Sequence, residues 1–198
     1  MLITRHLWRG STLVELMIGI TIMGILLALA LPSFTTWLQS GQIRSAAEAL
    51  QNGISLARTE AVNRNSTVRF QFTSTLDATC TLANSGTNWI VSLDDPEGLC
   101  NVAPSDVTTP RTIQARSGGE GTPNAVVAST QSAIVFNGLG RVTPVPAGNI
   151  VINVTNTKGG TCAASGGNMR CLNVEVTPGG NVRMCDPKFA ATDPQGCR

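Results

Sequence analysis

The chain has 198 residues, of which 14 are Lys or Arg and 12 are Asp or Glu, so its formal net charge is +2. Arg5 and Arg9 both precede a long apolar run, and a chain cut before that run would have balanced charge, which excludes a whole-molecule attraction to nucleic acid. The only histidine, His6, also precedes the run, so a shortened chain cannot build Ser-His-Asp or Cys-His nucleophiles, and we expect neither an enzyme nor a cofactor.

The first element is a long helix, which we predict over residues 11–65. No charged residue lies between Glu15 and Arg44, and most residues up to Leu38 are apolar. A bilayer core needs roughly 20 such residues in a helix, so the pattern predicts a transmembrane segment at about 13–38. Basic flanks stay in the cytoplasm, which places the rest of the chain outside it. Pro32 removes one backbone donor and predicts a kink.

The second half of this helix has an amphipathic pattern. Apolar residues recur at gaps of three and four along one face, at Ile43, Ala46, Ala47, Leu50, Ile54, Ala57 and Ala61. We expect this face to pack on the chain's own head, and residues 63–66 to end the helix.

In residues 66–198 apolar and polar residues tend to alternate, which is the two-residue period of β-strands. Strands are predicted at Thr67–Phe72, Asn88–Leu93, Thr112–Arg116, Ala133–Phe136, Ile150–Val154, Cys171–Val176 and Val182–Cys185. Val68, Phe70 and Phe72 should face the core. Turns rich in Gly and Pro separate the strands, and residues 117–124 suggest a flexible surface loop. The fold class is therefore α+β, a long N-terminal helix packed on an all-β, antiparallel, sandwich-like head.

All six cysteines lie in the head, and no two have the Cys-x-x-Cys spacing of a metal site. We therefore expect disulfides, an oxidising compartment and no metal. Six cysteines allow 15 pairings, among which sequence proximity favours Cys80–Cys100, Cys162–Cys171 and Cys185–Cys197. The acidic run at residues 94–97 lacks the spacing of a calcium loop, and a solvated turn is the favoured interpretation.

The start of the helix carries the most specific motif. Residues 10–16 read Gly-Ser-Thr-Leu-Val-Glu-Leu, which resembles the type III signal of type IV pilins and type II secretion pseudopilins. The resemblance implies that a prepilin peptidase removes a leader, residues 1–10, after Gly10, and that the new amino terminus is methylated. Ser11 departs from the usual Phe of the motif. An anchor that is never cleaved is the alternative for this segment.

Glu15 is the strongest candidate functional residue. A carboxylate near a bilayer core costs about 2.5–3.5 kcal/mol, which makes a functional role the default hypothesis. Cleavage after Gly10 would create an α-amine on Ser11, and the amine of a neighbouring subunit could neutralise Glu15. The family resemblance implies this role in subunit docking. The alternative is that the Glu15 side chain only extends to the lipid headgroups at the membrane surface.

The head adds a second resemblance. Residues 136–141 and 179–185 are similar to segments of the GspH/FimT group of minor pilins, in particular its FimT/FimU type. This implies a minor pilin of the type IV pilus that helps to prime assembly within a minor-pilin complex near the tip. Its partners would be the major pilin, other minor pilins and the inner-membrane assembly platform. It would cross the inner membrane once, with a periplasmic head, and then enter the fibre.

Three alternatives stay open. A type II secretion pseudopilin shares the same signal and fold, and a plain membrane-anchored periplasmic β-domain is the least specific alternative. Some FimT proteins bind DNA through a C-terminal Gly-Arg-x-Arg motif, but residues 180–183 here read Gly-Asn-Val-Arg. A basic patch for DNA would consist of Arg170, Arg183, Lys188 and Arg198. Ordinary solvated charges are the favoured interpretation, because acidic residues are interspersed and aromatic residues are few.

Overall fold

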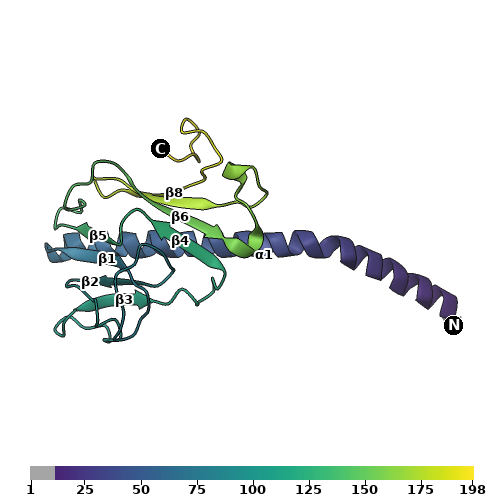
Figure 1. The fold of residues 1–198 in the computed structure, drawn as a ribbon, viewed down its shortest axis with the longest axis horizontal. Helices are drawn as coiled ribbons and strands as arrows, with labels where there is room; N and C mark the ends of the chain where they lie inside the picture. The colour runs from purple at the N-terminus through teal and green to yellow at the C-terminus, as the bar shows by residue number, and fades with distance from the viewer. Residues whose placement is uncertain (1–11) are drawn as a thin grey trace, which may run out of the picture. The chain divides into compact units, whose positions relative to one another are not determined.

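The computed structural model describes residues 12–198, apart from the side chains of residues 29–33. The chain divides into two compact units, Met1–Trp37 and Leu38–Arg198. A single helix, α1 (Leu13–Arg64), contributes to both (Figure 1). The second unit therefore begins within the helix, well before the first strand.

The described large apolar side chains in the first half of α1 are exposed, from Leu13 at 74% to Trp37 at 69%. Within the described residues, no helix is both long enough and apolar enough to cross a membrane. The helix begins where Thr12 Oγ1 accepts the backbone N–H of Glu15 at 3.3 Å, an N-cap contact.

The second half of α1 packs on the head as predicted. The seven residues of the expected apolar face are 0–4% exposed and belong to the main core, together with strands from both sheets. Figure 1 shows strands of both sheets beside this part of the helix. The helix ends at Arg64, where Asn65 takes a left-handed φ of 45° and Ser66 N–H binds Ala61 O at 3.1 Å. The predicted end at residues 63–66 is confirmed.

Within residues 12–198, eight strands form two antiparallel four-stranded sheets. The first has the order β3-β2-β1-β5, with β1 (Val68–Phe72), β2 (Trp89–Ser92), β3 (Thr112–Arg116) and β5 (Ala133–Phe136). The second has the order β4-β6-β7-β8, with β4 (Ala125–Ser129), β6 (Ile150–Asn156), β7 (Leu172–Val176) and β8 (Val182–Cys185). Two short 3-10 turns, η1 (Thr157–Gly159) and η2 (Ala163–Ser165), separate β6 from β7. The α+β sandwich-like architecture is confirmed.

Seven strands match the sequence prediction to within two residues, and Val68, Phe70 and Phe72 are fully buried as expected. The prediction missed β4, which pairs with β6 on one side and through the Ser85–Ala128 bridge on the other. Its run Ala-Val-Val-Ala-Ser has no polar–apolar alternation, so only the pairing identifies it as a strand.

The loop at residues 117–124 lies at the surface as predicted, with Gly119, Glu120, Gly121 and Pro123 exposed, but two of its residues are packed. Thr122 is 4% exposed and its hydroxyl donates to Gly118 O at 3.0 Å. Gly118 N–H donates to Asn88 Oδ1 at 3.0 Å, and a Cβ at Gly118 would lie 1.5 Å from Thr87 Oγ1. The glycine is therefore required for close approach to the chain before β2.

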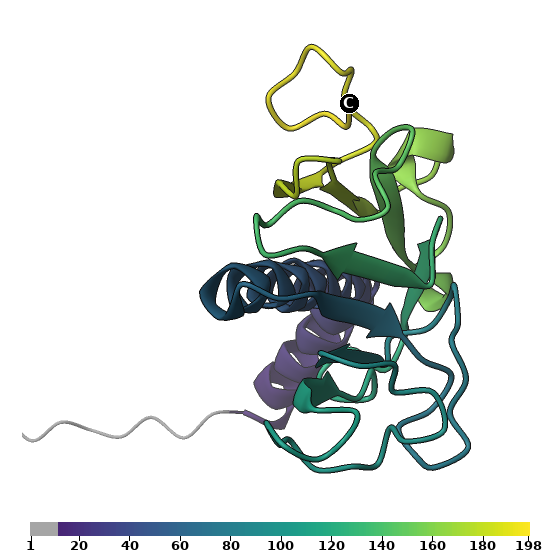
Figure 2. The same ribbon diagram turned by 90° about the vertical axis from the view of Figure 1, so that its left-hand side faces the viewer.

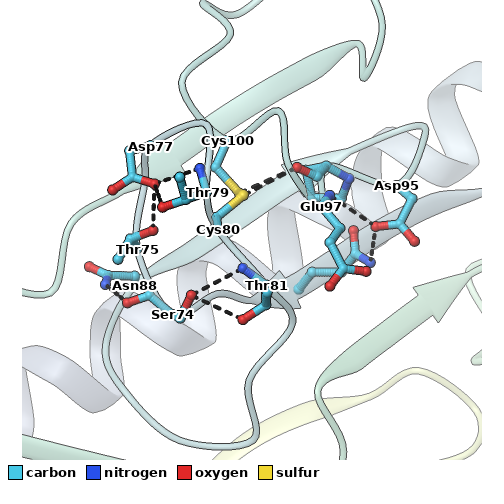
Figure 3. Close-up of a disulfide and its surroundings, with 12 residues drawn as sticks. Ser74, Thr75, Asp77, Thr79, Cys80, Thr81, Asn88, Asp95, Glu97 and Cys100 are labelled. Atoms are coloured by element: carbon cyan, nitrogen blue, oxygen red, sulfur yellow. Dashed lines mark hydrogen bonds between the residues drawn. A yellow bond between two sulfur atoms is a disulfide. The ribbon is translucent and has the colours of Figure 1, made fainter.

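Loops cover the outer face of the first sheet. Residues 73–88 and 93–111 are joined by the disulfide Cys80–Cys100, which packs with Ile90 in a second small core (Figure 3). Gln71, on the same face of β1, is 1% exposed and donates to Asp95 Oδ1 at 3.4 Å. The other disulfides are Cys162–Cys171 and Cys185–Cys197, so the structure contains the three pairs that sequence proximity favours.

Candidate assembly and contact sites

The predicted processing residues, Gly10 and Ser11, lie outside the described residues. Glu15, the predicted assembly residue, lies in the first turn of α1 and is exposed. Its carboxylate forms no hydrogen bond or ion pair within residues 12–198. The side chain is therefore available to a group from another molecule.

Beside Glu15 one face of the helix is hollowed. The shallow concavity is lined by Glu15, Leu16, Gly19, Ile20 and Met23. Nothing lies within 4 Å of the position that a Cβ on Gly19 would take. A neighbouring helix could thus approach closely here, with a carboxylate at one end of an otherwise apolar surface.

Pro32 lies within α1, which continues from Leu13 to Arg64. Its side chain belongs to the part of the helix that is not described. The kink therefore stays a prediction.

Two of the four C-terminal cations are bound to buried carboxylates. Arg183 Nη2 lies 2.7 Å from Glu175 Oε2, and the Glu175 side chain is only 3% exposed. Arg170 Nε lies 2.9 Å from Asp186 Oδ2, whose side chain is 5% exposed. Because buried charges need partners, these arginines primarily neutralise carboxylates within the head.

The other two cations, Lys188 and Arg198, are exposed and belong to the C-terminal tail, residues 186–198 (yellow in Figure 2). This tail is held on the second sheet. Arg198 N–H donates to Glu175 Oε1 at 3.1 Å, and Asn149 Nδ2 donates to Arg198 O at 3.0 Å. The Arg198 contact with Glu175 uses the backbone N–H, so the side-chain charges of Lys188 and Arg198 have no buried acidic partner in the described chain.

Glu175, Cys185 and Cys197 lie close enough together for a metal site. The two sulfurs are joined in a disulfide, however, and the carboxylate accepts hydrogen bonds from Arg183 and Arg198. These ligand atoms are already engaged, so the cluster fits a structural clamp on the tail better than a metal.

The head motifs form a junction that sequence reasoning did not identify. Gly140 O accepts Arg58 Nε at 3.1 Å, and a Cβ on Gly180 would lie 2.0 Å from that same oxygen. Val142 N–H donates to Pro178 O at 3.1 Å. The turn at residues 137–141, the turn at residues 177–181 and helix α1 therefore meet at one point. The sequence signal for it is glycine at positions 140 and 180, since both residues take a positive φ that favours glycine.

The acidic run at residues 94–97 is a turn tied by an arginine. Arg111 makes two contacts with Asp94, at 2.7 Å from Nε and 2.6 Å from Nη2. This hydrogen bonding lowers the pKa of Asp94 below its usual range. Asp77, which lies near the Cys80–Cys100 disulfide, also has a lowered pKa, because it accepts hydrogen bonds from Thr79 (Figure 3).

Comparison with known proteins gives two family matches. The model of the type II transport protein GspH family matches residues 46–180, and that of the prokaryotic N-terminal methylation motif matches residues 9–31. A search of curated protein sequences finds no significant match. The GspH match begins on the packed face of α1 and ends at Gly180 of the junction.

One solved structure shows the same fold, and a second crystal form of that protein is also similar. A crystal structure of the Pseudomonas aeruginosa type IV minor pilin FimU, in space group P21, has a TM-score of 0.51 at 14% identity, covering 80% of this chain and 96% of that one. A second FimU crystal form, P65, has a TM-score of 0.49 at 13% identity, covering 78% and 99%.

Proposed function

The chain belongs to the GspH family, and from that premise we propose that it is a minor pilin of a type IV pilus, made as a prepilin and incorporated into the fibre. The observation that carries this proposal is the order of the parts. An N-terminal methylation motif at residues 9–31 is followed on the same chain by a head with the fold of a minor pilin.

Processing and localisation follow from the motif. A prepilin peptidase cuts after Gly10, and the new amino terminus on Ser11 becomes methylated. The segment at about 13–38 holds the protein in the inner membrane, with a cytoplasmic N-terminus and a periplasmic head. The absence of charge between Glu15 and Arg44 supports this placement.

The assembly role centres on Glu15. Its carboxylate has no partner within residues 12–198 and lies at one end of the apolar concavity around Gly19. An incoming subunit's α-amine would neutralise it, and an ion pair in apolar surroundings is stronger than one in water. The protein would thereby join the major pilin, other minor pilins and the assembly platform, and help to prime assembly near the tip.

The test is Glu15→Ala, compared with wild type by immunoblotting of sheared pili and of membranes. We expect an unchanged amount of processed protein in the membrane and at least about a tenfold loss from the fibre, because one lost charge pair in apolar surroundings is worth more than about 1.4 kcal/mol. Glu48→Ala is the matched control, since Glu48 is an exposed helix carboxylate paired with Arg44. Equal incorporation of both variants would refute the role of Glu15.

A type II secretion pseudopilin is the second candidate, favoured by the description of the matching family. The two functions differ in phenotype. Deletion should abolish surface pili and twitching if the protein is a minor pilin, but secretion of folded enzymes if it is a pseudopilin. DNA uptake scored in the same deletion strain tests the remaining DNA hypothesis, to which Arg170 and Arg183 contribute little free charge.

A further inference from the structure

The two most exposed aromatic side chains of the described residues lie together at the end of the apolar run. Trp37 is 69% exposed and Phe34 is 55% exposed. Their ring centroids are 6.0 Å apart and their planes make an angle of 26°, so the rings stack on one side of α1. By contrast, Phe70, Phe72, Phe136 and Trp89 are 0–2% exposed in the core. An exposed stacked pair of this size needs an apolar or amphipathic partner.

We propose that Phe34 and Trp37 are an aromatic anchor that binds the lipid–water interface on the periplasmic side of the membrane and sets the depth of the helix before assembly. This rests on the proposed membrane anchoring. Trp is suited to that region because its ring is apolar while its indole N–H can bind water or a headgroup.

The length of the helix supports this assignment. At 1.5 Å per residue, α1 rises about 33 Å from Glu15 to Trp37. The hydrocarbon core of a bilayer is about 30 Å thick. A helix that places Glu15 at one boundary therefore brings Trp37 to the other.

The distribution of charge along the chain fits the hydrocarbon core of a bilayer and the headgroup region beyond it. The chain carries no charge from Leu16 to Ile43, which suits hydrocarbon, and the next charge, Arg44, is exposed and suits headgroups and water. Trp37 lies near the end of this uncharged run, seven residues before Arg44, where an amphipathic ring is expected. A neighbouring helix could also cover the apolar residues, but packing against a helix would not require an aromatic residue between the apolar run and the first charge.

The experiment measures the depth of the indole in vesicles of phosphatidylethanolamine and phosphatidylglycerol that contain the full chain. Lipids brominated at acyl carbons 6 and 7, or at carbons 11 and 12, quench shallow or deep tryptophans respectively. The signal of Trp37 is the difference between wild type and Trp37→Phe, which leaves Trp8 and Trp89 in place. We expect shallow bromines to quench this signal at least about twofold more than deep ones.

A relocated indole provides the matched control. Leu27 is an exposed residue of the same helix, about 15 Å from Trp37 along its axis. In the variant Trp37→Phe/Leu27→Trp the order should reverse, with deep bromines quenching more strongly. Flotation of the vesicles reports separately whether the chain is bound to lipid.

The outcomes separate the two proposals. A chain that floats with the vesicles but whose Trp37 is quenched equally by both lipids, or by neither, overturns the anchor alone. Equal or absent quenching is also the result expected if a neighbouring helix covers Trp37. A chain that does not float overturns the membrane anchoring as well.

Discussion

At the scale of single residues, the glycine junction is the part of the head with the least tolerance for a side chain. Gly180 has a φ of +83°, and its Cβ would meet a backbone oxygen, which cannot move aside as a flexible side chain can. Arg58, a residue of α1, donates a hydrogen bond to that same oxygen. The junction thus links α1 to both sheets through the Arg58 side chain and backbone groups of the two turns.

Gly180→Ala should therefore destabilise the head strongly. Backbone strain at such a φ costs about 1–3 kcal/mol, and the clash adds to it. The control is Gly121→Ala, because Gly121 has a similar φ of +77° but nothing within 4 Å of its Cβ position. Thermal unfolding followed by circular dichroism should show at least twice the loss in midpoint for Gly180→Ala. Equal losses would mean that the contact with Gly140 is unimportant.

The Asp94–Arg111 pair predicts a pH dependence. The pKa of Asp94 is lower in the folded chain than its ordinary value of about 4. The ionised form thus contributes stability above about pH 4, and this contribution is lost as the pH falls through the folded pKa. Asp94→Asn should be less stable than wild type at pH 7, and this difference should shrink between about pH 4 and pH 2. A difference that stays constant down to pH 2 would contradict the argument.

At the scale of elements, α1 is a structural part of the head rather than only an anchor. Its packed face fills the space between the two sheets with small and branched residues, of which Ile54 is fully buried. Gly53 lets Trp89 lie against the helix, since a Cβ there would be 2.7 Å from the indole ring. The helix and both sheets therefore share one core.

Ile54→Ala should accordingly lower the free energy of unfolding by about 2–5 kcal/mol, because it leaves a cavity at the centre of that core. Val62→Ala is the comparison on the same helix, since Val62 is 48% exposed and its truncation should cost about 0.5 kcal/mol or less. Denaturant unfolding of the detergent-solubilised chain measures both. Similar values for the two variants would show that the helix packs loosely.

At the scale of the whole molecule, the head has one main core and a small outer one. The main core contains α1 and both sheets, whereas Cys80, Ile90 and Cys100 form the outer cluster beneath the loops of the first sheet. The tail is clamped to the second sheet by Glu175 and the disulfide Cys185–Cys197. Cys162–Cys171 and Cys185–Cys197 therefore tie peripheral chain beside the second sheet, whereas Cys80–Cys100 joins two loops that cover the first.

This arrangement predicts a local effect of removing the outer disulfide. The double variant Cys80→Ala/Cys100→Ala should lose about 3 kcal/mol, as expected for opening a loop of this length. Proteolysis should increase within residues 73–111, while amide protection of β6 and β7 is retained. The same analysis of Cys162→Ala/Cys171→Ala should leave residues 73–111 protected. Uniform loss of protection would show that the two cores unfold as one.

Local sequence patterns by themselves determined much of this protein. The spacing of Ile43, Leu50 and Ile54 identifies the packed face of the helix, because a 3.6-residue period needs no knowledge of the partner. Alternation at Val68, Phe70 and Phe72 identifies a strand in the same way. Proximity alone favours the three disulfides, since short loops close at the smallest entropic cost. The signal at residues 10–16 is likewise local.

Features that depend on contacts between segments distant in sequence could be identified only from the tertiary structure. It shows that β4 is a strand, since β6 pairs with it. It shows that Arg183 forms an ion pair with the buried Glu175, although each residue type by itself suggests a surface charge. It brings Gly140 and Gly180 to Arg58, and it orders the strands into two sheets around one helix. The physical reason is the same in each case: pairing, ion-pair burial and close backbone approach are properties of two segments, and no pattern within one segment contains them.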